Sequence, residues 1–378
     1  MNFGFFGIQF SFGLQQSNMS AIYKYLGADE GSLPMLWLAG PITGLIVQPI
    51  VGAISDGTWS PKFGRRKPFF LIGALISSVA LLLMPYSNTL FMAASLLWIL
   101  DAANNVAMEP YRAFVADKLD ESQQPIGFQA QSFFTGFGQT LANVSLFIFP
   151  MIFIGTTGKL PTWVFASFIL GSVCSIGSVW WSSYTTKEIP PTDEELQKIQ
   201  SEKVSVFTPF VDILLAIKEM PKVMWQLALV YMFQWYALFC YWQNAAKSIA
   251  QSVWKTSPSL NKVLYEEAVG WTGLVNGWYN VVTFLSAFGL VGLANKFGPK
   301  QVHFICLLLA GGGLLMFPFI ENKYLLFAPM TGFGVAWASM MGVPYLLVVN
   351  DIPKERYGVY MGIINMMIVI PMIFQTLT

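Results

Sequence analysis

A polar stripe interrupts a long apolar stretch of the chain, which runs from Leu90 to Val115. On a helix that turns about 100° per residue, one face of this stretch collects the following side chains: Asp101, Asn104, Asn105, Met108 and Arg112. An ionised carboxylate inside a hydrocarbon core costs at least about 2.5 to 3.5 kcal/mol, and such residues usually face a bundle interior or a water-filled path. Asp101 therefore predicts a route for a substrate or an ion.

The charges of this stretch have different expected partners. Arg112 lies eleven residues after Asp101, roughly 16 Å along a helix axis, so the two cannot pair directly. Glu109 is spaced to pair with Arg112 at i,i+3, either to lock one end of the helices or to act in transport. Desolvation penalises the charged form of an acid, so Asp101 could exchange a proton. We predict that role for Asp101; the alternative is a buried acid that fixes helix packing.

The composition indicates a polytopic α-helical membrane protein. Hydrophobic residues make up 55% of the chain and charged residues 11%, whereas soluble domains average roughly 25% charged residues. Eleven apolar intervals are long enough to cross a hydrocarbon core of about 30 Å: 3–24, 34–55, 68–86, 89–116, 125–155, 161–183, 223–250, 268–293, 301–320, 324–349 and 357–377. The odd count and the lack of a basic residue before the first interval lead us to expect a twelfth helix and a basic N-terminus outside this sequence.

The basic residues predict the orientation, because they gather in cytoplasmic loops. With the N-terminus inside the cell, only six of the 21 Lys and Arg residues fall on the outer side: Lys24, Lys159, Lys247, Lys255, Lys262 and Lys323. The net charge of +1 gives no reason to expect a nucleic-acid partner.

The chain divides into two sets of spans. We expect an N-terminal half at 1–183, a cytoplasmic linker at 184–221 and a C-terminal half at 222–378. Pro190 and Pro191 interrupt helices in the linker, and apolar residues recur at helical spacing from Phe210 to Ile217, which suggests a short amphipathic helix on the membrane surface. The alternative is a solvated linker between the halves. The segments 62–67 and 296–300 echo each other at an offset of 234 residues, as expected of repeated halves with a substrate near the midplane between them.

Amide and aromatic side chains in other spans suit a sugar, since amides bind hydroxyl groups and flat rings pack against the C–H face of a pyranose. Gln9 and Gln15 lie among phenylalanines in the first span. Gln243 lies in the seventh span, and Asn276 and Asn280 lie one turn apart in the eighth. The alternative for each is a hydrogen bond between helices.

Several other chemistries find no support. The isolated Cys174, Cys240 and Cys306 form neither a disulfide framework nor a metal spacing, and His303 at a span end is a poor proton relay. No phosphate-binding P-loop occurs, and no nucleophile and base are paired. We expect no enzyme activity, no cofactor and no metal.

The loop after the second span resembles the signature of the major facilitator superfamily. It reads Ser55-Asp-Gly-Thr-Trp-Ser-Pro-Lys-Phe-Gly-Arg-Arg-Lys-Pro68, with Asp56 ending one helix and Arg65 and Arg66 opening the next. Ion pairs and helix-terminus contacts in this loop would hold the cytoplasmic face shut.

Longer segments narrow the resemblance. Gly7 to Gln15, Leu38 to Gly52, Leu100 to Asn105 and Tyr111 to Asp117 resemble the proton-coupled sucrose transporters of plants and their relatives in solute carrier family 45 and the glycoside-pentoside-hexuronide symporter group. Pro353 to Pro371 is similar to the animal and bacterial branch.

The resemblance implies a twelve-helix fold of two six-helix halves that moves a disaccharide or related glucoside with a proton. It assigns proton coupling to Asp101, assistance to Arg112, and sugar contacts to Gln9 and Gln15, with Asp117 in the gating motif. We add Asn104, Asn105, Gln243, Asn276 and Asn280 to the expected sugar site.

Departures from the plant pattern point to a bacterial α-glucoside symporter. Phe12 replaces a tryptophan of plant members, and Gln243 to Lys247 replaces an acidic Gly-Arg-Glu pattern. We expect a monomer in a bacterial inner membrane that takes sucrose or maltose. The alternatives are Na⁺-coupled or uncoupled transport by the same fold and, more distantly, a membrane sugar sensor.

Overall fold

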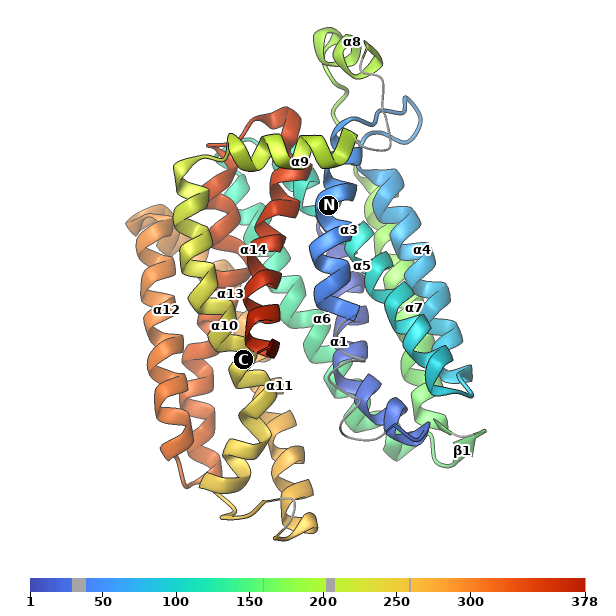
Figure 1. The fold of residues 1–378 in the computed structure, drawn as a ribbon, viewed down its shortest axis with the longest axis vertical. Coiled ribbons are helices and arrows are strands. Elements are labelled where there is room, and N and C mark those ends of the chain that lie inside the picture. Colours follow the sequence, from blue (N-terminus) through green and yellow to red (C-terminus); the bar gives the residue numbers. More distant parts are fainter. Residues whose placement is uncertain (29–38, 159, 202–207, 258–259, 378) are drawn as a thin grey trace.

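The computed structural model describes residues 1–28, 39–158, 160–201, 208–257 and 260–377. These residues form thirteen α-helices, most of them long and side by side (Figure 1). The one strand pair in them, β1 at Thr156–Thr157 and β2 at Leu160–Pro161, is antiparallel and closes the turn between two helices. The predicted all-α membrane fold is therefore confirmed in its architecture.

Each of the eleven apolar intervals coincides with one long helix, although residues 34–38 of the second interval lie outside the described residues. The helices are α1 Phe3–Tyr25, α3 Ala39–Asp56, α4 Lys67–Leu83, α5 Leu90–Lys118, α6 Gln124–Ile152, α7 Thr162–Thr185, α10 Lys222–Ser252, α11 Lys262–Phe297, α12 Pro299–Met316, α13 Phe327–Val349 and α14 Tyr357–Leu377. Eight of these meet the length and apolarity needed to cross a membrane within the described residues, namely α4, α5, α7 and α10 to α14.

The long helices gather into two bundles, which Figure 1 separates by colour. The first bundle holds α1 and α3 to α7, with α1 against α6 and α7 and with α4 against α5 and α7. The second holds α10 to α14, with α13 against α11 and α12. The bundles meet where α3 packs on α14 and where α6 packs on α11. The division into two functional halves stays a prediction.

Two shorter helices lie between the bundles in sequence, α8 at Asp193–Ser201 and α9 at Thr208–Lys218. Helix α9 contacts both α3 and α14, so it crosses one end of the molecule from one bundle to the other (Figure 1). Its Ile213 and Ala216 are buried, whereas Phe210, Val211 and Leu214 are exposed. A helix with two apolar faces, one packed and one free, suits a membrane surface. Two of the lysines that predict the orientation, Lys159 and Lys203, lie outside the described residues.

Local sequence explains the ends of several helices. The side chain of Asn261 accepts hydrogen bonds from the amides of Val263 and Leu264 and so begins α11 six residues earlier than the apolar pattern suggests. Gly64 and Gly298, in the two loops that echo each other, both have positive φ angles, of 82° and 85°, which glycine adopts without strain. Short 3₁₀ helices lie at Met84–Tyr86, Phe317–Phe319, Lys323–Leu326 and Lys354–Arg356.

Small residues allow close helix contacts inside the first bundle. A Cβ atom at Gly73 of α4 would lie 2.6 Å from the backbone oxygen of Ala103 and 2.7 Å from the backbone nitrogen of Ala107, both in α5. Backbone atoms cannot yield as a flexible side chain does. The closeness of α4 and α5 therefore depends on the missing side chain, and it fixes the helix that holds Asp101.

We expect Gly73→Ala to lower the free energy of unfolding by about 1–3 kcal/mol, because overpacking forces backbone shifts. Thermal unfolding of the purified protein in detergent measures this. The matched control is Gly312→Ala in α12, where an added Cβ meets nothing within 4 Å. Equal melting temperatures for the two variants would contradict the packing argument.

Candidate functional site

The Asp101 carboxylate lies between α1 and α3, facing away from water. Its Oδ1 accepts a hydrogen bond of 2.5 Å from Nε2 of Gln15 in α1. On the other side, a Cβ atom at Gly40 of α3 would be 3.8 Å from Oδ2, in ordinary contact. The side chain is 2% exposed. Two helices that lie far from Asp101 in the sequence therefore enclose the acid predicted to couple protons.

The two asparagines that follow Asp101 turn toward the same two helices. Nδ2 of Asn104 donates to Oγ of Ser11 in α1 at 3.0 Å. Nδ2 of Asn105 donates to Oγ1 of Thr43 in α3 at 3.0 Å, and its Oδ1 accepts a hydrogen bond from Gln48. The polar stripe of α5 thus lies along a seam between α1 and α3.

Gln9 extends this seam toward α6. Its Nε2 lies 3.9 Å from the sulfur of Met108, and its Oε1 accepts a hydrogen bond of 3.1 Å from Gln139. The predicted members of the first bundle, Gln9, Gln15, Asp101, Asn104 and Asn105, are all buried and are linked to this one seam.

Two buried carboxylates of α5, Asp101 and Glu109, differ in their compensation. Glu109 has the partner predicted for it, since Nη1 of Arg112 lies 2.8 Å from its Oε1. Asp101 has a neutral amide and, among the described residues, no ion pair. A buried charge without a counter-charge is far more costly than a paired one. The difference singles out Asp101 as the group whose charge the fold does not neutralise.

Arg112 connects α5 to the second bundle. Its guanidinium lies over the ring of Tyr345 in α13, 4.7 Å from the centroid, at a distance typical of a cation–π contact. Tyr345 in turn stacks on Phe128 of α6. The Glu109–Arg112 pair is therefore part of the contact between bundles.

The second bundle contains the remaining predicted residues. Oδ1 of Asn276 accepts a hydrogen bond of 2.7 Å from the hydroxyl of Tyr241, and Asn280 is buried on α11. Gln243, on α10, is exposed and so differs from the other predicted site residues. Nearby tryptophans form a cluster in which the ring of Trp337 lies edge-on to Trp235 and Trp242, with centroids 5.7 and 5.6 Å apart.

Several buried polar atoms of these two regions have no hydrogen-bond partner among the described residues. In the first bundle they include the amide oxygens of Gln15 and Asn104, and in the second the Oδ1 of Asn280 and the indole nitrogens of Trp235 and Trp337. Buried polar groups are nearly always satisfied in proteins, by protein or by ordered water or ligand. Acceptors in the first bundle, with donors and an acceptor in the second, suit a ligand with hydroxyl groups.

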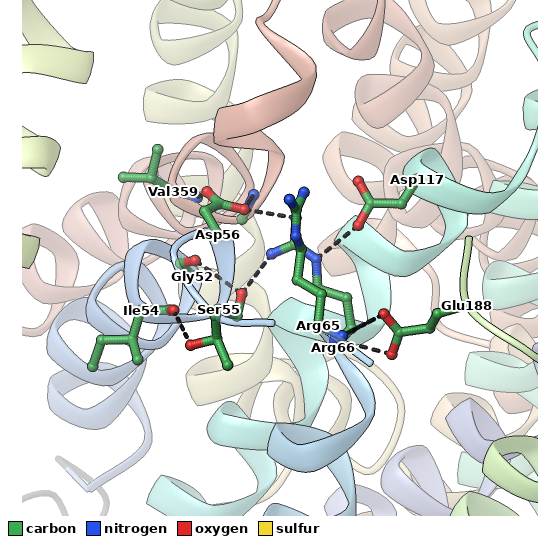
Figure 2. Close-up of polar contacts among 11 residues, drawn as sticks. Gly52, Ile54, Ser55, Asp56, Arg65, Arg66, Asp117, Glu188 and Val359 are labelled. Atoms are coloured by element: carbon green, nitrogen blue, oxygen red, sulfur yellow. Dashed lines mark hydrogen bonds and ion pairs between the residues drawn. The ribbon is translucent and has the colours of Figure 1, made fainter. Parts of the chain in front are cut away.

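An ion-pair cluster (Figure 2) joins α3, α5 and α14 at the end of the molecule that α9 crosses (Figure 1). Arg66, just before α4, lies 2.6 Å from Oδ1 of Asp56 at the end of α3 and 2.7 Å from Oδ2 of Asp117 in α5. Asp56 also accepts hydrogen bonds of 2.9 Å from the amides of Gly358 and Val359, in the first turn of α14. The loop predicted to hold one face shut does join the two bundles.

Arg66 is fully buried in this cluster. Burial alone would lower the pKa of its guanidinium, but Asp117 and Asp56 outweigh that effect and raise the pKa above its ordinary value. The arginine therefore stays charged, and the cluster has one cation for two carboxylates.

Glu188, after α7, caps α4. Its carboxylate accepts hydrogen bonds of 2.7–3.1 Å from the backbone amides of Arg65, Arg66 and Lys67. An acid at a helix N-terminus satisfies free amides and complements the helix dipole. Arg65, which contributes one of those amides, also lines a cavity of about 710 Å³ with Asp117 and Glu188.

Sequence patterns did not reveal several of these partners. Gln48 and Thr43 bind Asn105, Glu188 caps α4, and Tyr345 receives Arg112. The sequence did contain a sign of the role of Gln48, since a single amide side chain in an apolar span usually forms a hydrogen bond with another helix. For Tyr345 and Glu188 the partner is over 100 residues away and nothing in the spacing shows it.

Metal binding has no geometric support in the described residues, where no group of three or more His, Cys, Asp and Glu could hold an ion.

His303 is buried in α12, and its Nδ1 lies 2.9 Å from the hydroxyl of Ser339 in α13. That contact links two helices of one bundle.

We expect Arg66→Met to lower the free energy of unfolding by about 3–5 kcal/mol, because Asp56 and Asp117 would lose their shared cation. Thermal unfolding in detergent, followed by size-exclusion chromatography, measures the loss. The control is Arg65→Met, since Arg65 is only half-buried and binds Glu188 through its backbone. Equal losses of stability in the two variants would contradict this role for Arg66.

Comparison with known proteins places this geometry in a family. The family model described as Major Facilitator Superfamily matches residues 1–376. Sucrose transport protein SUT5 of Oryza sativa subsp. japonica is 24% identical over 98% of this chain and 79% of its own length. Sucrose transport protein SUC3 of Arabidopsis thaliana is 29% identical, but over 51% of this chain and 37% of its own length.

Solved structures agree on the fold. The structure of the proton:xylose symporter XylE bound to 6-bromo-6-deoxy-D-glucose has a TM-score of 0.67 at 15% identity, covering 99% of this chain and 86% of XylE. A mutant of the nucleoside transporter NupG has a TM-score of 0.61, also at 15% identity, over 99% of this chain and 89% of NupG. These proteins are transporters, not enzymes, and the chain belongs to the major facilitator superfamily.

Proposed function

We propose that this chain is a proton-coupled sugar symporter, with sucrose, maltose or a related α-glucoside as substrate. The observation that supports it most is Asp101, a buried carboxylate that lacks the counter-charge its neighbour Glu109 has. Taking up a proton removes an uncompensated charge from a site with little water. The buried site therefore favours proton binding, and binding changes the charge that the surrounding helices enclose.

The sugar would bind between the bundles. Gln15 and Asn104 offer amide oxygens to hydroxyl groups, and Trp235 and Trp337 offer indole N–H groups and flat faces. Sugar sites commonly combine a few polar groups with aromatic walls. Relatives bearing the name sucrose transport protein, and the proton:xylose symporter of similar fold, support this choice of substrate class. Gln9, Asn105, Gln243, Asn276 and Asn280 remain proposed contributors.

In the transport cycle that we propose, the ion-pair cluster at Arg66 keeps the α9 end closed while proton and sugar enter from the other side. Arg112 and Glu109 support the closed contact through Tyr345. Opening then requires Asp56 to leave the first turn of α14. We place the α9 end and the N-terminus in the cytoplasm of a bacterial cell, on the inner membrane, and expect the protein to work as a monomer.

We expect Asp101→Asn to abolish proton-driven accumulation, because asparagine cannot exchange a proton but keeps the size and hydrogen bonding of the acid. Uptake of radiolabelled sucrose and maltose into proteoliposomes, with and without an inward proton gradient, measures this. The control Asp351→Asn changes an exposed aspartate after α13 and should accumulate sugar normally.

The same assay separates the alternatives. Concentrative uptake by Asp101→Asn would refute proton coupling through this residue. Accumulation that follows a Na⁺ gradient instead would make the chain a sodium symporter, and equilibration without any gradient would make it a facilitator. Sugar binding without uptake would leave a sensor.

A second prediction concerns the tryptophans proposed to contact the sugar, Trp235 and Trp337. Trp337→Phe keeps a ring but removes an indole N–H that has no partner among the described residues, so we expect the KM for sugar to rise roughly two- to tenfold, the worth of one hydrogen bond. Trp278→Phe is the control, because the indole of Trp278, on the exposed side of α11, already donates a hydrogen bond to Thr331 of α13. An unchanged KM in Trp337→Phe would remove this tryptophan from the sugar site.

A further inference from the structure

Helix α3 lies between the helix of Asp101 and the second bundle, and one buried amide joins it to the latter. Asn365 of α14 is 5% exposed, and its Nδ2 donates a hydrogen bond of 2.9 Å to the backbone oxygen of Gly44 in α3. A polar side chain in a membrane span is usually placed for a partner or a function. Here the partner is a backbone atom of the opposite bundle.

The contact is close because glycines line it, Gly44 and Gly52 on α3 and Gly358 on α14. A Cβ atom at Gly44 would lie 3.1 Å from Nδ2 of Asn365 and 3.2 Å from Val369. Farther along, a Cβ at Gly52 would lie 2.2 Å from the backbone oxygen of Gly358. Little slack exists between α3 and α14, so a shift of one must move or break contacts with the other.

The same turn of α3 also faces the Asp101 seam. Gly40 lies against the Asp101 carboxylate, and Thr43 receives the hydrogen bond of Asn105. Gly44 is the next residue after Thr43 and lies one turn after Gly40. A displacement of this turn at Asp101 therefore displaces the oxygen that Asn365 binds.

The sequence of α3 favours such a displacement. Pro49 lies inside the helix and has no N–H, so the carbonyl of Leu45 loses its usual helical partner. Kinks and small bends in helices gather at prolines of this kind. The turn between Gly44 and Pro49 is thus the part of α3 that bends most easily.

We propose that Asn365 is a positioning residue of the transport cycle, through which the occupancy of Asp101 acts on the contact between the bundles. With Asp101 ionised, the turn at Gly40 to Gly44 stays where Asn365 holds it, and the α9 end remains closed. Neutralising Asp101 lets the turn shift, which breaks the bond to Gly44 and favours separation of α3 from α14. This inference rests on the proposed function for its place in a proton-driven cycle.

The experiment measures the opening of the α9 end directly. Spin labels on cysteines at Lys62 and Glu355, exposed residues at that end of the two bundles, report their separation by double electron–electron resonance in a background without the three native cysteines. We expect Asn365→Leu to raise the ratio of the long-distance to the short-distance population roughly two- to tenfold, the range for one lost hydrogen bond.

Two further variants serve as a second test of the interface and as a control. Gly44→Ala keeps the amide of Asn365 but adds a methyl group against it, so it should shift the distances in the same direction even if Asn365→Leu does not fold. Ser78→Ala removes a buried side-chain bond of 3.1 Å to a backbone oxygen within the first bundle and should leave the distances unchanged. Unshifted distances in both interface variants would overturn the proposal.

Transmission from Asp101 is tested by a double-mutant cycle, since residues that act independently add. Asp101→Asn alone should raise the long-distance population, and in the Asn365→Leu background it should add less than half of that shift. No shift from Asp101→Asn, or full additivity of the two changes, would overturn the inference. The distance measurement needs no substrate. A chain that fails to move sugar in proteoliposomes would therefore refute the proposed function but leave this test of Asn365 intact.

Discussion

The hydrocarbon core offers no hydrogen bonds to a polar side chain, and the polar groups inside these helices are arranged around that constraint. Asn104, Asn105 and Gln9 each have a partner on a neighbouring helix, and Glu109 has Arg112. Every such contact between helices fixes the rotation of one relative to the other. Asp101 is the member of this set whose charge stays uncompensated, so in the cycle that we propose the arrangement of α1, α3 and α5 depends most on its protonation.

Helix α3 links that event to the closed end of the molecule. Its first turns lie against Asp101 through Gly40, and its last residue, Asp56, binds Arg66 and the first turn of α14. The seventeen residues from Gly40 to Asp56 span roughly 24 Å. A rigid helix of that length would rotate both ends together, whereas Pro49 divides it into two parts. The proposed proton site and the ion-pair cluster are therefore joined by one helix that is able to bend between them.

Much of the fold was predictable because each span must bury its own backbone hydrogen bonds in a membrane of fixed thickness. That requirement located eleven helices from apolarity and length, and the face of α5 from periodicity. The same reasoning placed Glu109 with Arg112, because i,i+3 neighbours meet within one helix. It could not find Tyr345 for Arg112 or Glu188 for the start of α4, since these contacts depend on how distant helices pack. The predicted start of α11 was also too late, because the Asn261 cap begins the helix with polar turns that the apolar pattern does not include.

In the cycle that we propose, the coupling of proton and sugar follows from comparing the charged and neutral forms of Asp101. An empty carrier with ionised Asp101 would have to enclose a charge without a counter-ion when both ends close, at a cost of several kcal/mol. Protonation removes that charge, and a bound sugar would satisfy the amide oxygens of Gln15 and Asn104 that lack partners among the described residues. Both ligands then lower the cost of the same closed intermediate, each by supplying what the buried site lacks. Neither alone removes both penalties, which is why the two should cross together.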